Sequence, residues 1–173
     1  MEELYALRGQ PVPPIAPVKP REMPQPQRSL LAHQNDMTST LEQFYQKKLH
    51  VEVLARRAVE SEYFREVSLR LGQDGQRVEY GAIKIMLDLL PVEVRQEILR
   101  ERQPLGRILT ESGVYFASRP RFYLRVTSDD FVNGALGLSV PQLLYGRRNT
   151  LVDARERPLA EIVEILPPGG SSE

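Results

Sequence analysis

Two segments of this chain have the alternating pattern of β-strands, and each carries one charged residue on an otherwise apolar face. The first segment, residues 62–71, places Arg65 on that face, and the second, residues 158–167, places Glu164 there. Alternation with a period of two is typical of half-buried β-strands, so both side chains are predicted to point inward. An unpaired charge in a core is costly. We therefore expect a partner or a ligand to meet each of these charges.

Two readings of the inward charges follow from the pattern alone. A guanidinium and a carboxylate in one cavity suggest an anionic ligand that also carries a hydroxyl group, whereas a buried Arg65–Glu164 ion pair would only support the fold. Glu161 lies on the opposite face of the same predicted strand. A shift of register by one residue would exchange Glu161 with Glu164, so either glutamate is a candidate for the site, and the alternation favours Glu164.

Composition excludes several classes of function. The 173 residues suffice for one domain, and 23 basic side chains balance 23 acidic ones, which predicts no binding to nucleic acid or to an anionic membrane. No apolar stretch is long enough to span a bilayer, and no secretion signal is evident, so we expect a cytoplasmic protein. The chain lacks cysteine and has only two histidines, His33 and His50. We therefore expect no metal and no cofactor.

The order of predicted elements indicates an α+β domain. Seven of the 14 prolines fall within residues 11–26, which predicts an extended N-terminal arm over residues 1–28, followed by the folded domain (29–168) and a flexible tail (169–173). Strands and helices are segregated, without the βαβ alternation of parallel sheets. This arrangement predicts an antiparallel β-sheet with helices packed on one side.

Individual elements have local signals. Ser39 and Glu42 have the spacing of a capping box in a first helix, and a short Asp-Gly turn at residues 72–75 joins two strands into a hairpin. Pro91 and Pro104 each suit the first turn of a helix. Strand patterns are found at 50–57, 62–71, 78–86, 122–126, 149–153 and 159–166.

Five short motifs resemble, in sequence and in order, the chorismate pyruvate-lyase family, also called 4-hydroxybenzoate synthases, and most closely its divergent branch. The likeness spans roughly residues 30 to 168. The motifs are Asp36-Met37-Thr38, Phe64-Arg65-Glu66-Val67, Pro104-Leu105-Gly106-Arg107-Ile108-Leu109, Leu144-Tyr145-Gly146-Arg147-Arg148, and Pro158-Leu159 followed by Glu164-Ile165-Leu166-Pro167.

The resemblance implies roles for particular residues. In the family, an arginine on the Arg-Glu strand binds the ring carboxylate, which implies this role for Arg65, and a glutamate before the terminal proline interacts with the ring hydroxyl, which implies Glu164. The site is further lined through backbone N–H groups, which implies substrate contacts at Met37, Thr38, Leu105 and Gly106. The Gly146-Arg147-Arg148 motif is interpreted as structural.

The function predicted on this basis is a cofactor-free carbon-oxygen lyase with Arg65 and Glu164 as catalytic residues. It would convert chorismate to 4-hydroxybenzoate and pyruvate and supply quinone biosynthesis. The alternative is a domain of the same fold that binds or senses a small aromatic acid without turnover, as in the ligand-binding domains of some transcription regulators. Binding of 4-hydroxybenzoate without turnover would favour this alternative.

Overall fold

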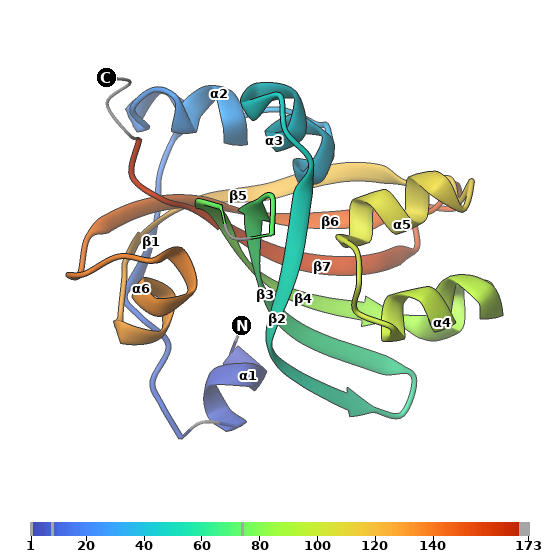
Figure 1. Ribbon diagram of the computed structural model, residues 1–173. Helices are drawn as coiled ribbons and strands as arrows, with labels where there is room; N and C mark the ends of the chain where they lie inside the picture. Colours follow the sequence, from blue (N-terminus) through green and yellow to red (C-terminus); the bar gives the residue numbers. More distant parts are fainter. Residues whose placement is uncertain (1, 8, 74, 170–173) are drawn as a thin grey trace.

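Antiparallel pairing joins all the strands of the structure into one seven-stranded sheet (Figure 1). The computed structural model describes residues 2–7, 9–73 and 75–169. The strands of the sheet are β1 (Ile15–Pro17), β2 (Leu49–Val59), β3 (Glu62–Leu71), β4 (Arg77–Met86), β5 (Ala117–Thr127), β6 (Leu143–Val152) and β7 (Pro158–Leu166). The predicted α+β class with an antiparallel sheet is confirmed.

The sheet consists of two three-stranded meanders placed side by side, with the short strand β1 added at one edge. Strands β2, β3 and β4 form the first meander and β5, β6 and β7 the second, and β4 pairs with β7, so that the order is β1-β5-β6-β7-β4-β3-β2. The predicted hairpin is β3–β4; its Asp74 lies outside the described residues. Because β4 and β7 are central, the inward residues of both meanders meet in the middle of one face.

Four helices and two short 3-10 turns come from the segments that connect the strands or precede them. Their bounds are η1 (Pro20–Glu22), α2 (Gln27–Leu31), α3 (Met37–Tyr45), η2 (Leu87–Leu89), α4 (Val92–Leu99) and α5 (Leu105–Glu111). Helices α2 to α5 cover one face of the sheet, and their apolar side chains form the larger core with residues of β3, β4 and β7 (Figure 1). Helix α3 packs against α5.

Two further helices, α1 (Glu2–Leu7) and α6 (Asp130–Leu136), lie against the opposite face. Tyr80 and Ala82 of β4 form a second core there with residues of α6. Both faces of the sheet are therefore buried at this end, although most helices pack on the predicted side.

The N-terminal segment is more structured than an extended arm. Residues 2–7 form a helix, and Ile15–Pro17 pairs with Leu124–Val126 as a short edge strand. Prolines are compatible with an edge strand because its outer N–H groups need no partner. Met23 is buried in the larger core, so this segment contributes to the domain. The predicted C-terminal tail, apart from Gly169, lies outside the described residues.

The first predicted helix begins earlier than the capping-box spacing suggested. Asp36 is the N-cap of α3, and its carboxylate accepts a hydrogen bond of 3.0 Å from the Ser39 N–H. Glu42 instead accepts a hydrogen bond of 2.9 Å from the Leu49 N–H and one from Arg107. An aspartate with extended backbone is a stronger cap than a serine three residues into the helix.

No helix of the described chain is long and apolar enough to cross a membrane.

Candidate functional site

A small cavity lies between the central strands of the sheet and the first turns of α3 and α5. Its volume is about 40 Å³. The walls are mainly apolar, and the polar groups come from Arg65, Glu79, Glu164 and the Asp36–Thr38 segment. The apolar walls are formed by Val51, Val67, Leu69, Ile83, Leu151 and Ile162.

Arg65 lines this cavity with a side chain that has no hydrogen-bond partner. The residue is fully buried, with 0% of its surface exposed, and none of its three guanidinium nitrogens contacts an acceptor among the described residues. Burial lowers the pKa of Arg65, while Tyr63 and Glu101 act in the opposite direction. Glu101 itself is engaged by the Tyr63 hydroxyl and by Arg56. A buried cation in this state is suited to an anion from outside the chain.

Glu164 lines the same cavity, but Arg65 is not its partner. Glu164 is 3% exposed, and its carboxylate forms an ion pair with the fully buried Arg147. Residues 147 and 164 are directly opposite each other in the β6–β7 pairing. Burial raises the pKa of Glu164, and the Arg147 guanidinium opposes this shift. The two charges singled out in the sequence therefore share a cavity without forming the ion pair of the purely structural reading.

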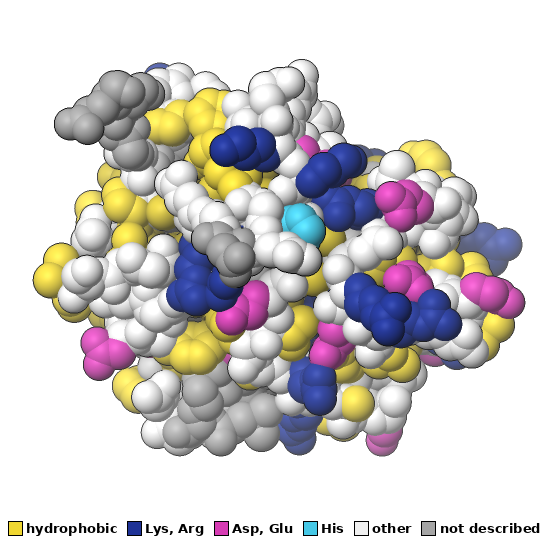
Figure 2. All heavy atoms as spheres, in the orientation of Figure 1, with side chains coloured by type: hydrophobic (Ala, Val, Ile, Leu, Met, Phe, Trp, Pro, Cys, Tyr) yellow, Lys and Arg dark blue, Asp and Glu magenta, His cyan; other side chains and the backbone are white. Residues whose placement is uncertain are grey.

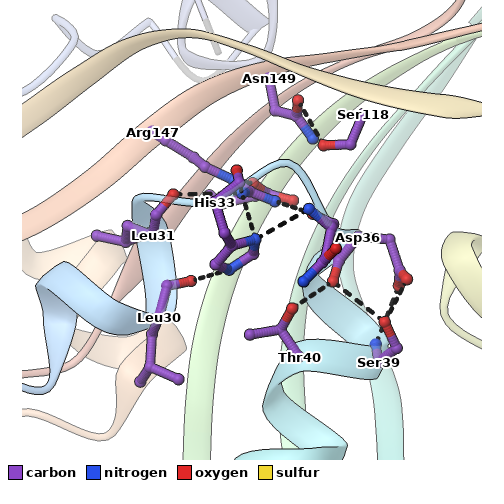
Figure 3. A network of polar contacts seen from close by, with 11 residues as sticks. Leu30, Leu31, His33, Asp36, Ser39, Thr40, Ser118, Arg147 and Asn149 are labelled. Carbon is purple, nitrogen blue, oxygen red and sulfur yellow. Dashed lines mark hydrogen bonds and ion pairs between the residues drawn. The ribbon is translucent and has the colours of Figure 1, made fainter.

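Arg147 also holds the segment between α2 and α3 (Figure 3). Its terminal nitrogens donate hydrogen bonds to the backbone carbonyl oxygens of Leu31, His33 and Asn35 at 3.3, 3.1 and 3.1 Å. The His33 ring accepts at Nδ1 from the Asn35 N–H at 3.1 Å, and burial together with Arg147 lowers the pKa of this histidine. Arg147 thus ties the sheet to the segment that leads into α3.

Glu79 is the polar group that sequence reasoning missed. It is 4% exposed, lines the cavity from β4, and its Oε2 atom has no hydrogen-bond partner among the described residues. Burial and the nearby Glu164 raise the pKa of Glu79 well above its usual range, and Arg147 opposes them. Of its two apolar neighbours, Val78 is buried in the larger core, and Tyr80 is buried on the other face, where α6 packs. The pattern of apolar residues in this strand therefore did not predict that Glu79 points into the cavity.

The four residues predicted as substrate contacts all lie at the cavity. Met37 and Thr38 begin α3, and Leu105 and Gly106 begin α5. The first N–H groups of a helix have no partner within the helix, so groups of this kind are available at both helix starts. Met37 and Leu105 are also buried in the larger core, which fixes the helix ends over the cavity.

Gly106 permits the close approach of α5 to the start of α3. A Cβ atom there would lie 2.7 Å from Asp36 Oδ1 and 3.1 Å from Thr38 Oγ1. We expect Gly106→Ala to lower the free energy of unfolding by about 1–3 kcal/mol, because the α3 cap must shift. The matched control is Gly134→Ala in α6, where a Cβ meets nothing within 4 Å. Urea denaturation should show that control to be stabilised by about 0.5–1 kcal/mol; equal effects of the two changes would contradict the packing argument.

Glu161, the alternative carboxylate, lies outside this cavity. Its carboxylate is partly exposed and lies 3.5 Å from the Arg148 guanidinium. Both residues line a hollow on the other face of the sheet, beside Lys84 and Phe122. The observed β6–β7 register therefore directs Glu164, and not Glu161, to the cavity.

The outer surface shows no concentration of one charge on the face that carries α3, α4 and α5. Figure 2 shows basic and acidic side chains interspersed there. Within the described residues, no three histidine, aspartate or glutamate side chains are grouped to hold a metal ion. The unpartnered Arg65 and Glu79 are therefore the groups most suited to an added ligand.

Comparison with known proteins supports the fold alone. No family model and no curated protein matches the chain. Among solved structures, PhnF from Mycobacterium smegmatis has a TM-score of 0.58 at 14% identity, covering 76% of this chain and 63% of PhnF. The effector domain of the same PhnF has a TM-score of 0.56 at 13% identity, with 76% and 87% covered. A putative transcriptional regulator from Streptomyces coelicolor has a TM-score of 0.52 at 14% identity, with 73% and 91% covered.

These similarities place the chain in the chorismate lyase-like fold. The chain spans less than two thirds of the PhnF chain but most of the effector domain taken alone.

The prediction of a carbon-oxygen lyase is wrong. Of the similar structures reported above, one is described as an effector domain and one as a putative transcriptional regulator, and none is described as a lyase. Conversion of chorismate to 4-hydroxybenzoate and pyruvate therefore has no support. The two predicted catalytic residues are not equally free to contact a ligand. The Glu164 carboxylate is already bound by Arg147, whereas Arg65 has no partner among the described residues.

Proposed function

We propose that this chain forms a ligand-binding domain that senses a small organic anion without chemical turnover. The observation that carries this proposal is the Arg65 guanidinium, which is fully buried, lines the cavity and has no hydrogen-bond partner among the described residues. A charge left in this state destabilises the fold, so it is best explained by a bound counter-charge. The similarity to an effector domain supports the same class of function.

The other predicted contact residues have complementary tasks in this proposal. Arg65 would bind the anionic group through two parallel hydrogen bonds, since a guanidinium matches a carboxylate in this way. The starts of α3 and α5, at Met37, Thr38, Leu105 and Gly106, would add backbone N–H groups. Glu164 would serve mainly to fix Arg147 and the floor of the cavity.

The size of the cavity limits the ligand. One buried water molecule occupies about 10–15 Å³ of such a cavity. The cavity volume of about 40 Å³ therefore corresponds to roughly three water molecules. An acetate-sized group fits the closed form, whereas an aromatic acid requires α3 and α5 to move apart. Such an opening would have to break the ion pair between Glu42 of α3 and Arg107 of α5.

Calorimetric titration with a charged ligand and its neutral isostere tests the proposal. We expect 4-hydroxybenzoate to bind, and 4-hydroxybenzamide to bind at least about tenfold more weakly, because a hydrogen bond to a charged group contributes about 1.5–3 kcal/mol. Acetate serves as the small anion that needs no opening of the helices. Equal affinity for the acid and the amide, or no binding of either anion by the folded chain, would contradict the proposal.

A further inference from the structure

A second unpartnered polar group faces the cavity that contains Arg65. Glu79 is 4% exposed, its Oε2 atom has no hydrogen-bond partner among the described residues, and no ion pair joins it to Arg65. Two buried polar groups of opposite type, both without partners, are rarely retained in one cavity unless something else binds them. A bound anion would provide a partner for Arg65 but would leave Glu79 without one.

The two groups lie toward opposite ends of the cavity floor. Arg65 is paired with Ile83 across β3 and β4, and Glu79 is four residues before Ile83 on β4. At about 3.3 Å per residue, these two positions on β4 are roughly 13 Å apart along the strand. Long side chains from both ends then extend over the residues between them.

Gly81 lies on β4 between these two ends. It pairs with Val67 on one side and with Glu164 on the other. A Cβ atom at Gly81 would lie 3.1 Å from Val67 Cγ2 and 3.4 Å from Glu79 Oε1. Because Gly81 has no side chain, the Val67 side chain and the Glu79 carboxyl can lie over β4 at this point, so the Glu79 carboxyl extends from its end of the strand toward a ligand in the cavity.

From this geometry we propose that Glu79 is the second binding residue of the site, and that it binds a neutral hydroxyl group at the end of the ligand opposite the anion. The inference rests on the proposed anion-binding function. It assigns the ligand to the class of small hydroxylated monocarboxylic acids. The ligand hydroxyl, which the family resemblance places at Glu164, is assigned to Glu79 instead. One unpaired cation in an apolar cavity matches one negative charge, which favours a monoanion over a phosphate ester with two charges.

Charges around Glu79 agree with a neutral group at this end. The acidic Glu164 and Asp36 face it together with the basic Arg147. Burial raises the pKa of Glu79, which keeps its carboxyl protonated over a wider range of pH. A protonated carboxyl donates one hydrogen bond and accepts another, as a ligand hydroxyl does.

The test measures how strongly the ligand hydroxyl depends on Glu79. In the wild-type chain, 4-hydroxybenzoate should bind about three- to tenfold more tightly than benzoate, in proportion to one neutral hydrogen bond. In Glu79→Leu this preference should fall below about twofold, while the affinity for benzoate stays within about twofold of wild type. Glu161→Leu on the other face is the matched control and should keep the full preference.

Other outcomes would overturn the assignment in distinguishable ways. Equal binding of the two acids by the wild-type chain removes the role of Glu79 but leaves the anion site, whereas binding of neither removes the proposed function itself. An equal loss of both affinities in Glu79→Leu would mean that Glu79 acts only through the fold. If that variant does not fold, a crystal structure of the wild-type complex decides: the ligand hydroxyl should contact Glu79, and contact with Glu164 instead would overturn the proposal.

Discussion

Replacing Arg65 with methionine is expected to stabilise the ligand-free protein and to abolish anion binding. Methionine is unbranched and of similar length, so it can fill the same space without the buried charge. Removing a buried charge that lacks a partner should raise the free energy of unfolding by about 1–4 kcal/mol. Urea denaturation without ligand measures this change, and stabilisation by added 4-hydroxybenzoate should disappear in the variant.

The control for this variant is Arg57→Met, on the neighbouring strand β2. Arg57 is exposed, so the change should alter the free energy of unfolding by no more than about 0.5 kcal/mol and leave binding intact. If Arg65→Met were clearly less stable than wild type without ligand, Arg65 would be a satisfied structural residue. The proposed anion site would then lose its main support.

Replacing Arg147 with methionine is expected to have the opposite effect on stability. The change removes the partner of the buried Glu164 carboxylate and three hydrogen bonds to the α2–α3 segment. Breaking a buried ion pair on one side costs about 3–5 kcal/mol. Urea denaturation should show this loss, and the variant should bind anions weakly because the start of α3 is no longer held.

Two further variants test whether the loss of stability is specific to Arg147 or would follow from any substitution in β6. Arg148→Met, on the next residue, removes only a partly exposed ion pair with Glu161 and should cost less than about 1 kcal/mol. The double change Arg147→Met with Glu164→Leu should recover much of the lost stability, since no buried charge is then left unpaired. A small effect of Arg147→Met alone would contradict the assignment of Arg147 as the partner that Glu164 requires.

The inward direction of Arg65 and Glu164 could be predicted because strand alternation is a local property. Each side chain follows from the period of its own strand, and both line the observed cavity. Which cation meets Glu164 depends instead on the pairing of β6 with β7 and of β7 with β4. That information is not contained in either strand alone, so an Arg65–Glu164 pair remained an open alternative in the sequence, and the structure pairs Glu164 with Arg147.

Glu79 and the N-terminal segment show a second limit. Tyr80, next to Glu79, suggests that the buried face of β4 is the one opposite the cavity, because α6 packs on that face, and this contact is not visible in the local sequence. The proline-rich segment predicts an extended backbone correctly at Ile15–Pro17, but its pairing with β5 is a long-range contact. Function was the least accessible from sequence, since short motifs of a fold family do not distinguish a lyase from a binding domain.

The most direct measurement is a crystal structure of the protein grown with 4-hydroxybenzoate, read at the carboxylate end of the ligand. We predict both carboxylate oxygens within about 2.7–2.9 Å of the Arg65 guanidinium nitrogens, with the starts of α3 and α5 moved apart to admit the ring. A ligand bound elsewhere, with the Arg65 guanidinium turned away from it, would contradict the account.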